Sequence, residues 1–467
     1  MPSDAALSAP DAAPTSRYPI DALLTDIGDV PSSLDANEIR RKSRDYYWYS
    51  PILNAQLKEK LADIVLTPRD EADVIRVAAA CYRHRIPLTA RGGATGNYGQ
   101  CVPLEGGVVL DMSAMNQIEW QKPGIVRVRT GAKLFNIDAQ TRPNGWELRM
   151  HPSTKRMSQI GGFVAGGSGG IGSVTYGGMR EPGNILAARI VTMEENPRVI
   201  ELRGDAAQKI SRAYGTTGII TALEMPLAPA LPWIDVIVAF DDFYEAVRFG
   251  QAIAMADGIV KKFLSPIQWP LPENFSAIRQ HCPDGKAVLL GMIGPMSIES
   301  FETLLELFSG TITYKAPSED VLTKAPLYEH TWNHCTLHMF KVDRNITYLQ
   351  VLHPHDRIVQ SATEIGARFE GEVMQHLQFI RINGLMTASG IPVIRYSTPE
   401  RLYEIMAAYE ACGIMIANPH VLTLEDGSRY KRVDADQFGY KHEVDPLGLL
   451  NPGKMRSFVP RSPGPLQ

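Results

Sequence analysis

Three glycine-rich segments are the part of this sequence best suited to chemistry. The first, residues 91–99, reads Arg-Gly-Gly-Ala-Thr-Gly-Asn-Tyr-Gly, and residues 151–162 and 166–170 add further glycines and several hydroxyl side chains. Glycine has no Cβ, so its backbone can adopt positive φ and bring N–H groups close to an anion. We interpret these segments as a cradle for a diphosphate.

Neither of the two common nucleotide motifs is present in the first segment. It lacks the G-x-x-x-x-G-K-[ST] pattern of a P-loop and the G-x-G-x-x-G pattern that opens a Rossmann helix. These absences disfavour ATP and a Rossmann-bound dinucleotide. A tight turn rich in glycine stays the alternative for any one segment taken alone.

Length and composition limit the class of protein that positions these segments. The chain has 467 residues, of which 44% are hydrophobic and 21% charged, and its formal net charge is −4. These values indicate a soluble globular protein with two domains, and they exclude a disordered chain or a membrane-spanning one. The balanced charge gives no reason to expect nucleic acid or an anionic membrane as a partner.

Local patterns predict how the segments are held. Residues 63–66 read as a strand, residues 70–82 as a capped helix and residues 87–90 as a second strand that runs into the first glycine segment. Further strands are expected at 107–110, 125–129, 187–193, 199–202 and 219–227. After the prolines at 226, 229 and 232 the pattern changes to strands at 234–240, 287–293 and 346–352 with a helix at 298–308, which predicts a second α/β domain.

The order of several motifs resembles a known superfamily. These are Arg91-Gly-Gly-Ala-Thr-Gly, Pro152-Ser-Thr followed by Gln-Ile-Gly-Gly, Tyr176-Gly177, Gly215-Thr-Thr-Gly-Ile-Ile-Thr and Asn451-Pro-Gly-Lys. Together they resemble the vanillyl-alcohol oxidase/p-cresol methylhydroxylase superfamily of FAD-linked oxidases. The first loop, with Pro103-Leu-Glu-Gly-Gly after it, is most similar to the glycolate oxidase/D-lactate dehydrogenase branch.

This resemblance implies an α+β fold in two domains, an FAD-binding domain of the p-cresol methylhydroxylase type with an inserted α/β substrate (cap) domain. The implied organisation is a flexible lead-in at 1–40, the FAD-binding domain at 41–230, the cap domain at 231–440 and a C-terminal segment at 441–467 that returns to the FAD domain. The residues implied to bind FAD are Arg91, Gly92, Gly93, Ala94, Thr95, Gly96, Pro152, Ser153, Thr154, Ile160, Gly161, Gly162, Gly167, Gly170, Tyr176, Gly177, Ile219, Ile220, Asn451 and Lys454.

The resemblance also predicts that FAD is held without a covalent bond. Relatives that tether FAD through a histidine in the first loop carry it where this chain has Thr95, and no cysteine lies between Gly145 and Gly215 to form a second tether. For Ile219 and Ile220 a buried strand is an equally good interpretation. The five cysteines show no metal or disulfide pattern, which favours a reducing cytoplasm.

The candidate catalytic residues are histidines of the second domain. A flavin enzyme that oxidises an alcohol benefits from a group that takes up the hydroxyl proton. Residues 328–338 are the densest supply, so we predict His334 as the leading candidate, with His338 and His420 as further ones. If this cluster were helical, His330, His334 and His338 would share one face and could hold a metal. Solvated or core histidines are the commoner case, and we predict no metal.

Two arginines are candidates for binding a substrate carboxylate. Arg381 and Arg395 lie in apolar stretches, and their planar side chains could clamp a carboxylate, although a surface ion pair is the alternative.

The sequence thus predicts an FAD-dependent oxidase or dehydrogenase that moves a hydride from an alcohol-bearing small molecule, for example a 2-hydroxy acid, to flavin N5. The first alternative is oxidation of a para-substituted phenol, and the second is a flavin-bearing electron-transfer subunit without its own substrate. The electron acceptor (oxygen, quinone or cytochrome) and a homodimeric state are left open. We expect no nucleic-acid partner and no membrane span.

Overall fold

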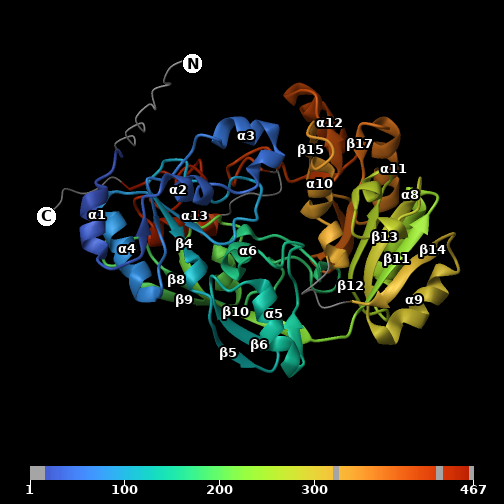
Figure 1. The fold of residues 1–467 in the computed structure, drawn as a ribbon, viewed down its shortest axis with the longest axis horizontal. Coiled ribbons are helices and arrows are strands. Elements are labelled where there is room, and N and C mark those ends of the chain that lie inside the picture. The colour runs from blue at the N-terminus through green and yellow to red at the C-terminus, as the bar shows by residue number, and fades with distance from the viewer. Residues whose placement is uncertain (1–15, 319–324, 428–434, 462–467) are drawn as a thin grey trace, which may run out of the picture.

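The computed structural model describes residues 16–318, 325–427 and 435–461, and within them the chain forms two halves that lie side by side (Figure 1). One half contains the N-terminal elements and the last helix, α13. The other contains the strands and helices between residues 234 and 416. This is the two-domain α+β arrangement predicted from the sequence. We call the two halves the FAD-binding half and the cap half, after the domains that the sequence analysis expects.

The first layer of the FAD-binding half is a four-stranded sheet in the order β1-β2-β4-β3. Its strands are β1 (Ser32–Ser33), β2 (Ile64–Leu66), β4 (Val108–Asp111) and β3 (Leu88–Arg91). Helix α4 (Glu71–His84) joins β2 to β3 and is capped by the Asp70 side chain, which accepts a hydrogen bond from the Asp73 N–H. Because β2 and β3 both run parallel to β4, the first glycine segment leaves the sheet at the carboxyl end of β3.

The second layer is a larger antiparallel sheet in the order β5-β6-β10-β8-β9, with β7 also paired to β10. Its strands are β5 (Ile118–Lys122), β6 (Ile125–Arg129), β10 (Ile219–Pro229), β8 (Ala187–Val191), β9 (Val199–Arg203) and β7 (Trp146–Leu148). Helices α5 (Leu134–Thr141), α6 (Ile160–Gly166) and α7 (Ser173–Tyr176) lie between these strands in the chain. One face of the sheet contributes Val126, Val128 and Leu223 to the hydrophobic core.

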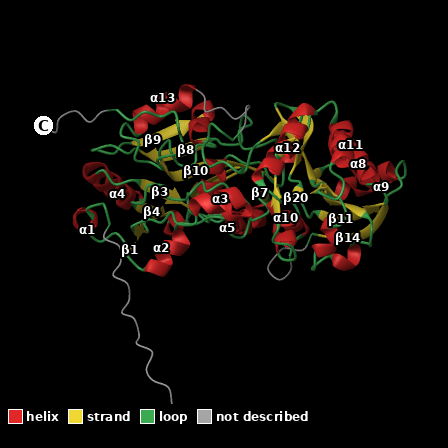
Figure 2. Ribbon diagram, turned by 90° about the horizontal axis from the view of Figure 1, so that it is seen from above, coloured by secondary structure: helices red, strands yellow, loops and turns green. Residues whose placement is uncertain are grey.

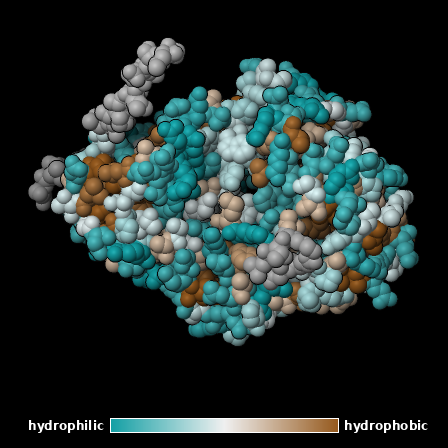
Figure 3. Space-filling model, viewed as in Figure 1, coloured by the Kyte–Doolittle hydropathy of each residue, from teal (hydrophilic) through white to brown (hydrophobic). Residues whose placement is uncertain are grey.

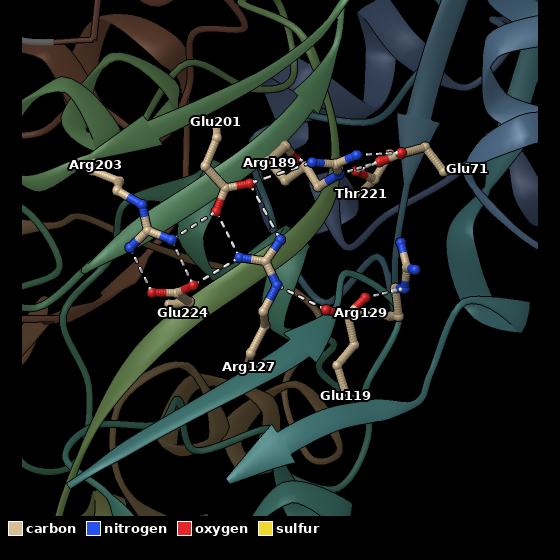
Figure 4. A network of polar contacts seen from close by, with 9 residues as sticks. All are labelled: Glu71, Glu119, Arg127, Arg129, Arg189, Glu201, Arg203, Thr221 and Glu224. Carbon is tan, nitrogen blue, oxygen red and sulfur yellow. Dashed lines mark hydrogen bonds and ion pairs between the residues drawn. The ribbon is translucent and has the colours of Figure 1, made fainter. Parts of the chain in front are cut away.

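The opposite face of this sheet carries a network of ion pairs (Figure 4). Arg127 lies at its centre, at 2.6–2.8 Å from the carboxylates of Glu119, Glu201 and Glu224. Arg189 of β8 makes two 2.8 Å hydrogen bonds with Glu71, the first residue of α4. This paired contact joins the two layers of the FAD-binding half.

The cap half is built on three antiparallel sheets. The first is ordered β12-β13-β11-β14, the second β18-β19-β16-β21 and the third β15-β20-β17. The strands are β11 (Ile234–Phe240), β12 (Lys261–Ile267), β13 (Ala287–Ile293), β14 (Thr311–Pro317), β15 (Ile346–Tyr348), β16 (Val351–Leu352), β17 (Val373–Met374), β18 (Leu377–Ile382), β19 (Leu385–Gly390), β20 (Val393–Arg395) and β21 (Met415–Ile416). The helices are α8 (Phe243–Met255), α9 (Ile298–Leu305), α10 (Asn333–Phe340), α11 (Ile358–Arg368) and α12 (Pro399–Ala411).

The chain returns to the FAD-binding half at α13 (Ala435–Val444). Tyr440 and Val444 belong to the hydrophobic core of that half, and the Met193 N–H donates to the Val444 carbonyl at 2.7 Å. The return therefore begins at or before Ala435, whereas the sequence analysis assigned residues up to 440 to the cap domain.

The N-terminal segment differs from the expected lead-in. Helix α1 (Ile20–Ile27) packs on α4, and its Leu23 and Ile27 side chains are fully buried. Its apolar residues recur three and four positions apart, which is helical spacing that the sequence analysis did not use. Helices α2 (Ala36–Lys42) and α3 (Pro51–Leu57) follow, so residues 20–40 are part of the fold. Residues 1–15 lie outside the described part of the chain.

The second view shows the same separation of halves (Figure 2), and the visible surface is largely hydrophilic with hydrophobic residues in separate groups (Figure 3). Across the described residues, no helix has the length and apolar character needed to cross a bilayer.

Candidate functional site

A cavity of about 710 Å³ lies where the two halves meet, and both halves contribute to its wall. This volume is in the range of sites that bind cofactors and small molecules. The FAD-binding half supplies the glycine segments and the cap half supplies mainly apolar side chains.

The first glycine segment forms one side of the cavity, directly after β3. A Cβ on Gly93 would overlap the carbonyl oxygen of Met157, and Ala94 has a φ of +49°. The backbone thus needs the small residues that the sequence places here. The Arg91 guanidinium donates to the carbonyls of Gly92 and Arg41, each at 3.3 Å. Arg91 therefore helps to fasten the end of α2 while it lines the cavity.

Residues 152–162 form the neighbouring side. The Ser158 hydroxyl lies 2.7 Å from the hydroxyls of both Thr95 and Thr154, which links this segment to the first loop. Gly161 donates its N–H to the Thr130 carbonyl at 2.9 Å, and a Cβ at this position would overlap the Thr130 side chain. A Cβ on Gly162 would meet no atom within 4 Å, so this glycine faces open space in the cavity.

Several polar atoms in the cavity wall are buried and have no hydrogen-bond partner among the described residues. They are Asp45 Oδ2, Asn97 Nδ2, Gln100 Oε1, Gln159 Oε1 and Asn333 Oδ1. A buried polar atom without a partner costs about 1–3 kcal/mol. A ligand rich in hydroxyl, phosphate and ring N–H groups would supply the partners, and FAD has these groups.

Asp45 and Lys454 are two buried groups of opposite charge, each of which influences the pKa of the other. Burial raises the pKa of Asp45 to about 6, although the Lys454 charge opposes this rise, and burial lowers the pKa of Lys454 to about 8. Lys454 donates to the Gly99 carbonyl at 2.6 Å. Asn451 donates to the carbonyls of Gln100 and Tyr214, both at 2.7 Å. The C-terminal motif thus holds the cavity wall from behind.

The structure brings most of the predicted FAD-binding residues to one cavity. Those in its wall are Arg91, Gly92, Gly93, Ala94, Thr95, Gly96, Pro152, Ser153, Thr154, Gly161, Gly162, Gly167 and Ile220. Outside the wall are Ile160, Gly170, Tyr176, Gly177, Ile219, Asn451 and Lys454. Ile160 and Ile219 are core residues, and a Cβ on Gly170 would overlap the His151 backbone.

The cap half closes the cavity with one face of the sheet β18-β19-β16-β21. Leu352 pairs with Ser389 on one neighbouring strand and with Met415 on the other, so these three side chains share a face. Ile380 and Ile382 of β18 lie on the same face, and all five line the cavity. Further cap residues of the wall come from the β15–β16, β18–β19 and β19–β20 connections and from the start of α10, and no cap residue in the wall has an acidic, basic, histidine or tyrosine side chain.

Trp332 lies in the cavity wall where the cap residues meet the glycine segments. Its φ of 51° and ψ of −141° lie in a region that only glycine adopts without strain. Its indole approaches Gly169 so closely that a Cβ there would lie 3.3 Å from the ring. The sequence analysis did not select Trp332, because a backbone conformation of this kind has no signature in the sequence.

The histidine cluster lies beside the cavity and does not line it. Helix α10 begins at Asn333, so His330 precedes the helix and the expected helical face is not formed. His330 and His338 nevertheless stack with ring centroids 5.0 Å apart. Burial lowers the pKa of His334 and of His338 to about 4, so both are neutral and weakly basic near pH 7. This geometry does not favour either as a proton acceptor. No three-residue group with the geometry of a metal site occurs in the described ranges.

His420 has a structural environment. Its Nε2–H donates to the Tyr348 carbonyl at 2.9 Å, and its Nδ1 lies 2.7 Å from the Ser50 hydroxyl. Both ring nitrogens are thus engaged, and only 2% of the residue is exposed. His420 joins the cap to helix α3, and its position gives no support to a catalytic role.

The two arginines predicted to bind substrate also lie away from the cavity wall. Arg381 pairs with Asp257 and donates to the Val174 carbonyl at 3.2 Å. Arg395 is half exposed and pairs with Asp343 at 3.3 Å. Both form the surface ion pairs that the sequence analysis gave as the alternative.

Other residues take the positions that these candidates were expected to fill. Tyr98, Arg180, Arg212 and Tyr214, all from the FAD-binding half, line the cavity. Tyr98 donates its hydroxyl hydrogen to Gln350 of the cap. Tyr98 lies inside the first glycine segment, from which the sequence analysis selected only residues 91–96, so taking the whole segment would have found it. Arg212 and Tyr214 lie outside the three glycine-rich segments, so no feature of the sequence pointed to them.

Comparisons with known proteins agree with this site. Residues 62–201 match a family model described as an FAD binding domain. The glycolate oxidase subunit GlcD of Escherichia coli (strain K12) is 28% identical over 207 residues, which cover 42% of this chain and 41% of that protein. The mitochondrial D-2-hydroxyglutarate dehydrogenase of Rattus norvegicus is 24% identical over 253 residues, 52% of this chain and 45% of that protein. The matches thus span less than half the length of these relatives.

The fold has a counterpart over nearly the whole chain. A solved structure of an alkyldihydroxyacetonephosphate synthase superposes with a TM-score of 0.71 and 18% identity, covering 95% of this chain and 86% of that one. At this identity the likeness concerns the fold alone.

These findings define the class of the protein. The chain contains an FAD-binding domain over residues 62–201, and over part of its length it is similar to a glycolate oxidase subunit and to a D-2-hydroxyglutarate dehydrogenase. FAD is its cofactor, and the cavity wall of glycines, hydroxyls and unpaired polar atoms fits that cofactor.

Proposed function

We propose that this chain is an FAD-dependent oxidoreductase that oxidises the alcohol group of a small molecule, with 2-hydroxy acids as the leading substrate class. The observation that carries the proposal is the shape of the cavity. The FAD-binding segments form only one side, and the other side is a separate wall of cap residues where a substrate could lie against the cofactor. The names of the relatives, a glycolate oxidase subunit and a D-2-hydroxyglutarate dehydrogenase, support this substrate class.

The glycine segments would hold FAD, which would supply a two-electron acceptor for the hydride of the substrate carbon, and the hydroxyl proton would pass to water as the carbonyl forms. The residues available to manage that proton come from the FAD-binding half. Tyr214 lines the cavity next to Arg212, whose positive charge lowers the pKa of the Tyr214 hydroxyl against the larger, opposite effect of burial. We assign Tyr214 to orient the substrate hydroxyl.

The test of the proposed function is anaerobic reduction of the bound flavin by a panel of donors. The panel contains short and long 2-hydroxy acids, simple alcohols and para-substituted phenols. Bleaching of the flavin by a 2-hydroxy acid supports the proposal. Bleaching by phenols alone would favour the phenol alternative, and no bleaching by any donor would favour an electron-transfer subunit.

The role of Tyr214 is tested in the same assay. Tyr214→Phe removes one hydroxyl and keeps the ring, and we expect flavin reduction to slow by at least ~10-fold with FAD content unchanged, in line with the usual contribution of a positioning or proton-transfer group. Tyr403→Phe is the matched control, because Tyr403 is an exposed tyrosine of α12. A wild-type rate in Tyr214→Phe would remove Tyr214 from the reaction.

A further inference from the structure

Arg212 is a cation in the cavity wall for which the described residues provide no carboxylate partner. It donates its backbone N–H to the Val164 carbonyl at 3.4 Å, and its Cβ lies against Gly167, where a glycine Cβ would overlap it. The residue is therefore fixed beside the glycine segment 166–170. Its φ is +55°, a left-handed conformation that is costly for a side chain other than glycine.

Backbone strain of this kind persists where the surrounding structure imposes it, and it occurs often at functional sites. Burial disfavours the charge of Arg212 and lowers its pKa, whereas the neighbouring hydroxyls of Tyr214 and Tyr98 act in the opposite direction. Arg180, which also lines the cavity, lowers the pKa of Arg212 further and so adds positive charge to this end. A partly desolvated guanidinium beside tyrosine hydroxyls is a strong binding site for a carboxylate.

The acidic residues of the wall do not neutralise this end. Within the described residues neither Asp45 nor Glu181 forms an ion pair with Arg212, and the groups that shift the pKa of Arg212 include tyrosines and Arg180 but no acid. The anion that Arg212 would bind must therefore come from a ligand.

A chain of contacts leads from Arg212 to the apolar face of the cap. Tyr98 lies near Arg212 and donates to Gln350, the residue directly before β16. Leu352 of β16 starts the apolar face, which continues through Met415, Ile380 and Ile382. A ligand with its anionic group at Arg212 would thus extend along hydrocarbon side chains.

We propose that the cavity binds an amphipathic acid, with the carboxylate held by Arg212 and an apolar chain or ring lying on the sheet face of Leu352, Met415, Ile380 and Ile382. The inference rests on the proposed function and narrows its substrate class from 2-hydroxy acids in general to those with a medium-length aliphatic or aromatic substituent. Glycolate and lactate have too little hydrocarbon to use this wall, because each buried CH₂ contributes to affinity.

The test uses octanoate, acetate and 1-octanol as probes, titrated calorimetrically into the FAD-loaded protein. We expect octanoate to bind at least ~10-fold more tightly than acetate and than 1-octanol. Arg212→Met keeps the chain length and the backbone strain but removes the charge, and it should raise the octanoate Kd at least ~10-fold. Arg212→Lys should recover part of the affinity, and Arg248→Gln, at an exposed arginine of the cap, should have no effect.

The wall is tested separately by Leu352→Gln, which should weaken octanoate binding and leave acetate binding unchanged. Equal affinities of the wild type for octanoate and acetate would overturn the proposal. So would loss of FAD from Arg212→Met with unchanged octanoate binding by the remaining holoprotein, because Arg212 would then serve the FAD diphosphate. If octanoate binds through Arg212 while no hydroxy acid reduces the flavin, the proposed function fails and the binding site stands.

Discussion

Gly162 gives the sharpest test of where FAD lies, because its Cα faces open space in the cavity and its neighbour Gly161 faces the protein. A Cβ at 162 meets nothing within 4 Å, so a side chain there can be placed without disturbing the fold. Gly162→Asp would put a carboxylate beside the FAD diphosphate. At a separation of about 6 Å and an effective dielectric constant of about 20, each phosphate charge is repelled by ~3 kcal/mol.

A loss of ~3–6 kcal/mol corresponds to a ~10²- to 10⁴-fold rise in the FAD Kd. The assay is titration of FAD into the apoprotein, followed by quenching of flavin fluorescence at low and high salt. Gly162→Asn is the matched control, since it has nearly the same shape without the charge. Gly162→Ala should stabilise the apoprotein by up to ~1 kcal/mol, because alanine is the better helix former in α6.

Equal FAD affinities for the Asp and Asn variants would refute the reasoning, because the charge would then lie far from the phosphates. An affinity difference that does not shrink at high salt would also contradict it, since screening weakens repulsion between charges in contact with solvent. Gly170→Asp is unsuited to this purpose. A Cβ there overlaps the His151 backbone, so the variant would disturb the fold whether or not FAD is near.

Four further outcomes follow from the ion-pair network and the histidines. Arg127→Met should lower the free energy of unfolding at pH 7 by ~1–3 kcal/mol in urea denaturation, because three carboxylates lose their common partner, and an unchanged midpoint would contradict this. The hydrogen bond from Arg127 holds the pKa of Glu201 in the folded protein below its ordinary 4.5. The stabilisation that this pair gives the fold should therefore be complete above about pH 4.5 and be lost as the pH falls through the folded-state pKa of Glu201. Acid should destabilise Arg127→Met less than the wild type. His420→Gln should lower the Tm, and His334→Gln should change flavin reduction by less than ~10-fold, since a ~100-fold loss would restore the catalytic role predicted from the sequence.

The cofactor side of the site was readable from the sequence because its physical requirements are local. A loop that brings backbone N–H groups to a diphosphate needs several glycines close together, and such runs are visible at 91–99 and 151–162. Strands of the cap half were equally visible: residues 234–240 and 287–293 form β11 and β13 with the predicted bounds. The residues beyond the glycines were harder to place, and Ile219 packs in the core although its neighbour Ile220 lines the cavity.

The cap wall of the cavity and Arg212 could not be predicted from the sequence, because their positions depend on strand register and on the backbone conformation of single residues. Leu352, Ser389 and Met415 are 26 or more residues apart in the chain and share a face only through the pairing of β16 with β19 and β21. The histidine prediction used residue type alone. A cluster of histidines meets that criterion for a proton acceptor whether it faces a cavity or a hydrophobic core. The stacked pair His330 and His338 is buried against Phe275.

Arg212 shows most clearly why local rules fail on the substrate side. A residue with φ of +55° is most often glycine, and a reading based on propensity assigns no role to an arginine in a turn. The conformation is held by the Val164 carbonyl and by close packing on Gly167, and it turns a cation toward a wall that is otherwise neutral on the cap side. Arg212→Gly would release the strain and add ~1 kcal/mol or more to the free energy of unfolding, while removing the cation. A variant that is more stable and yet binds octanoate less tightly would separate the two effects, as expected where strain is retained for binding.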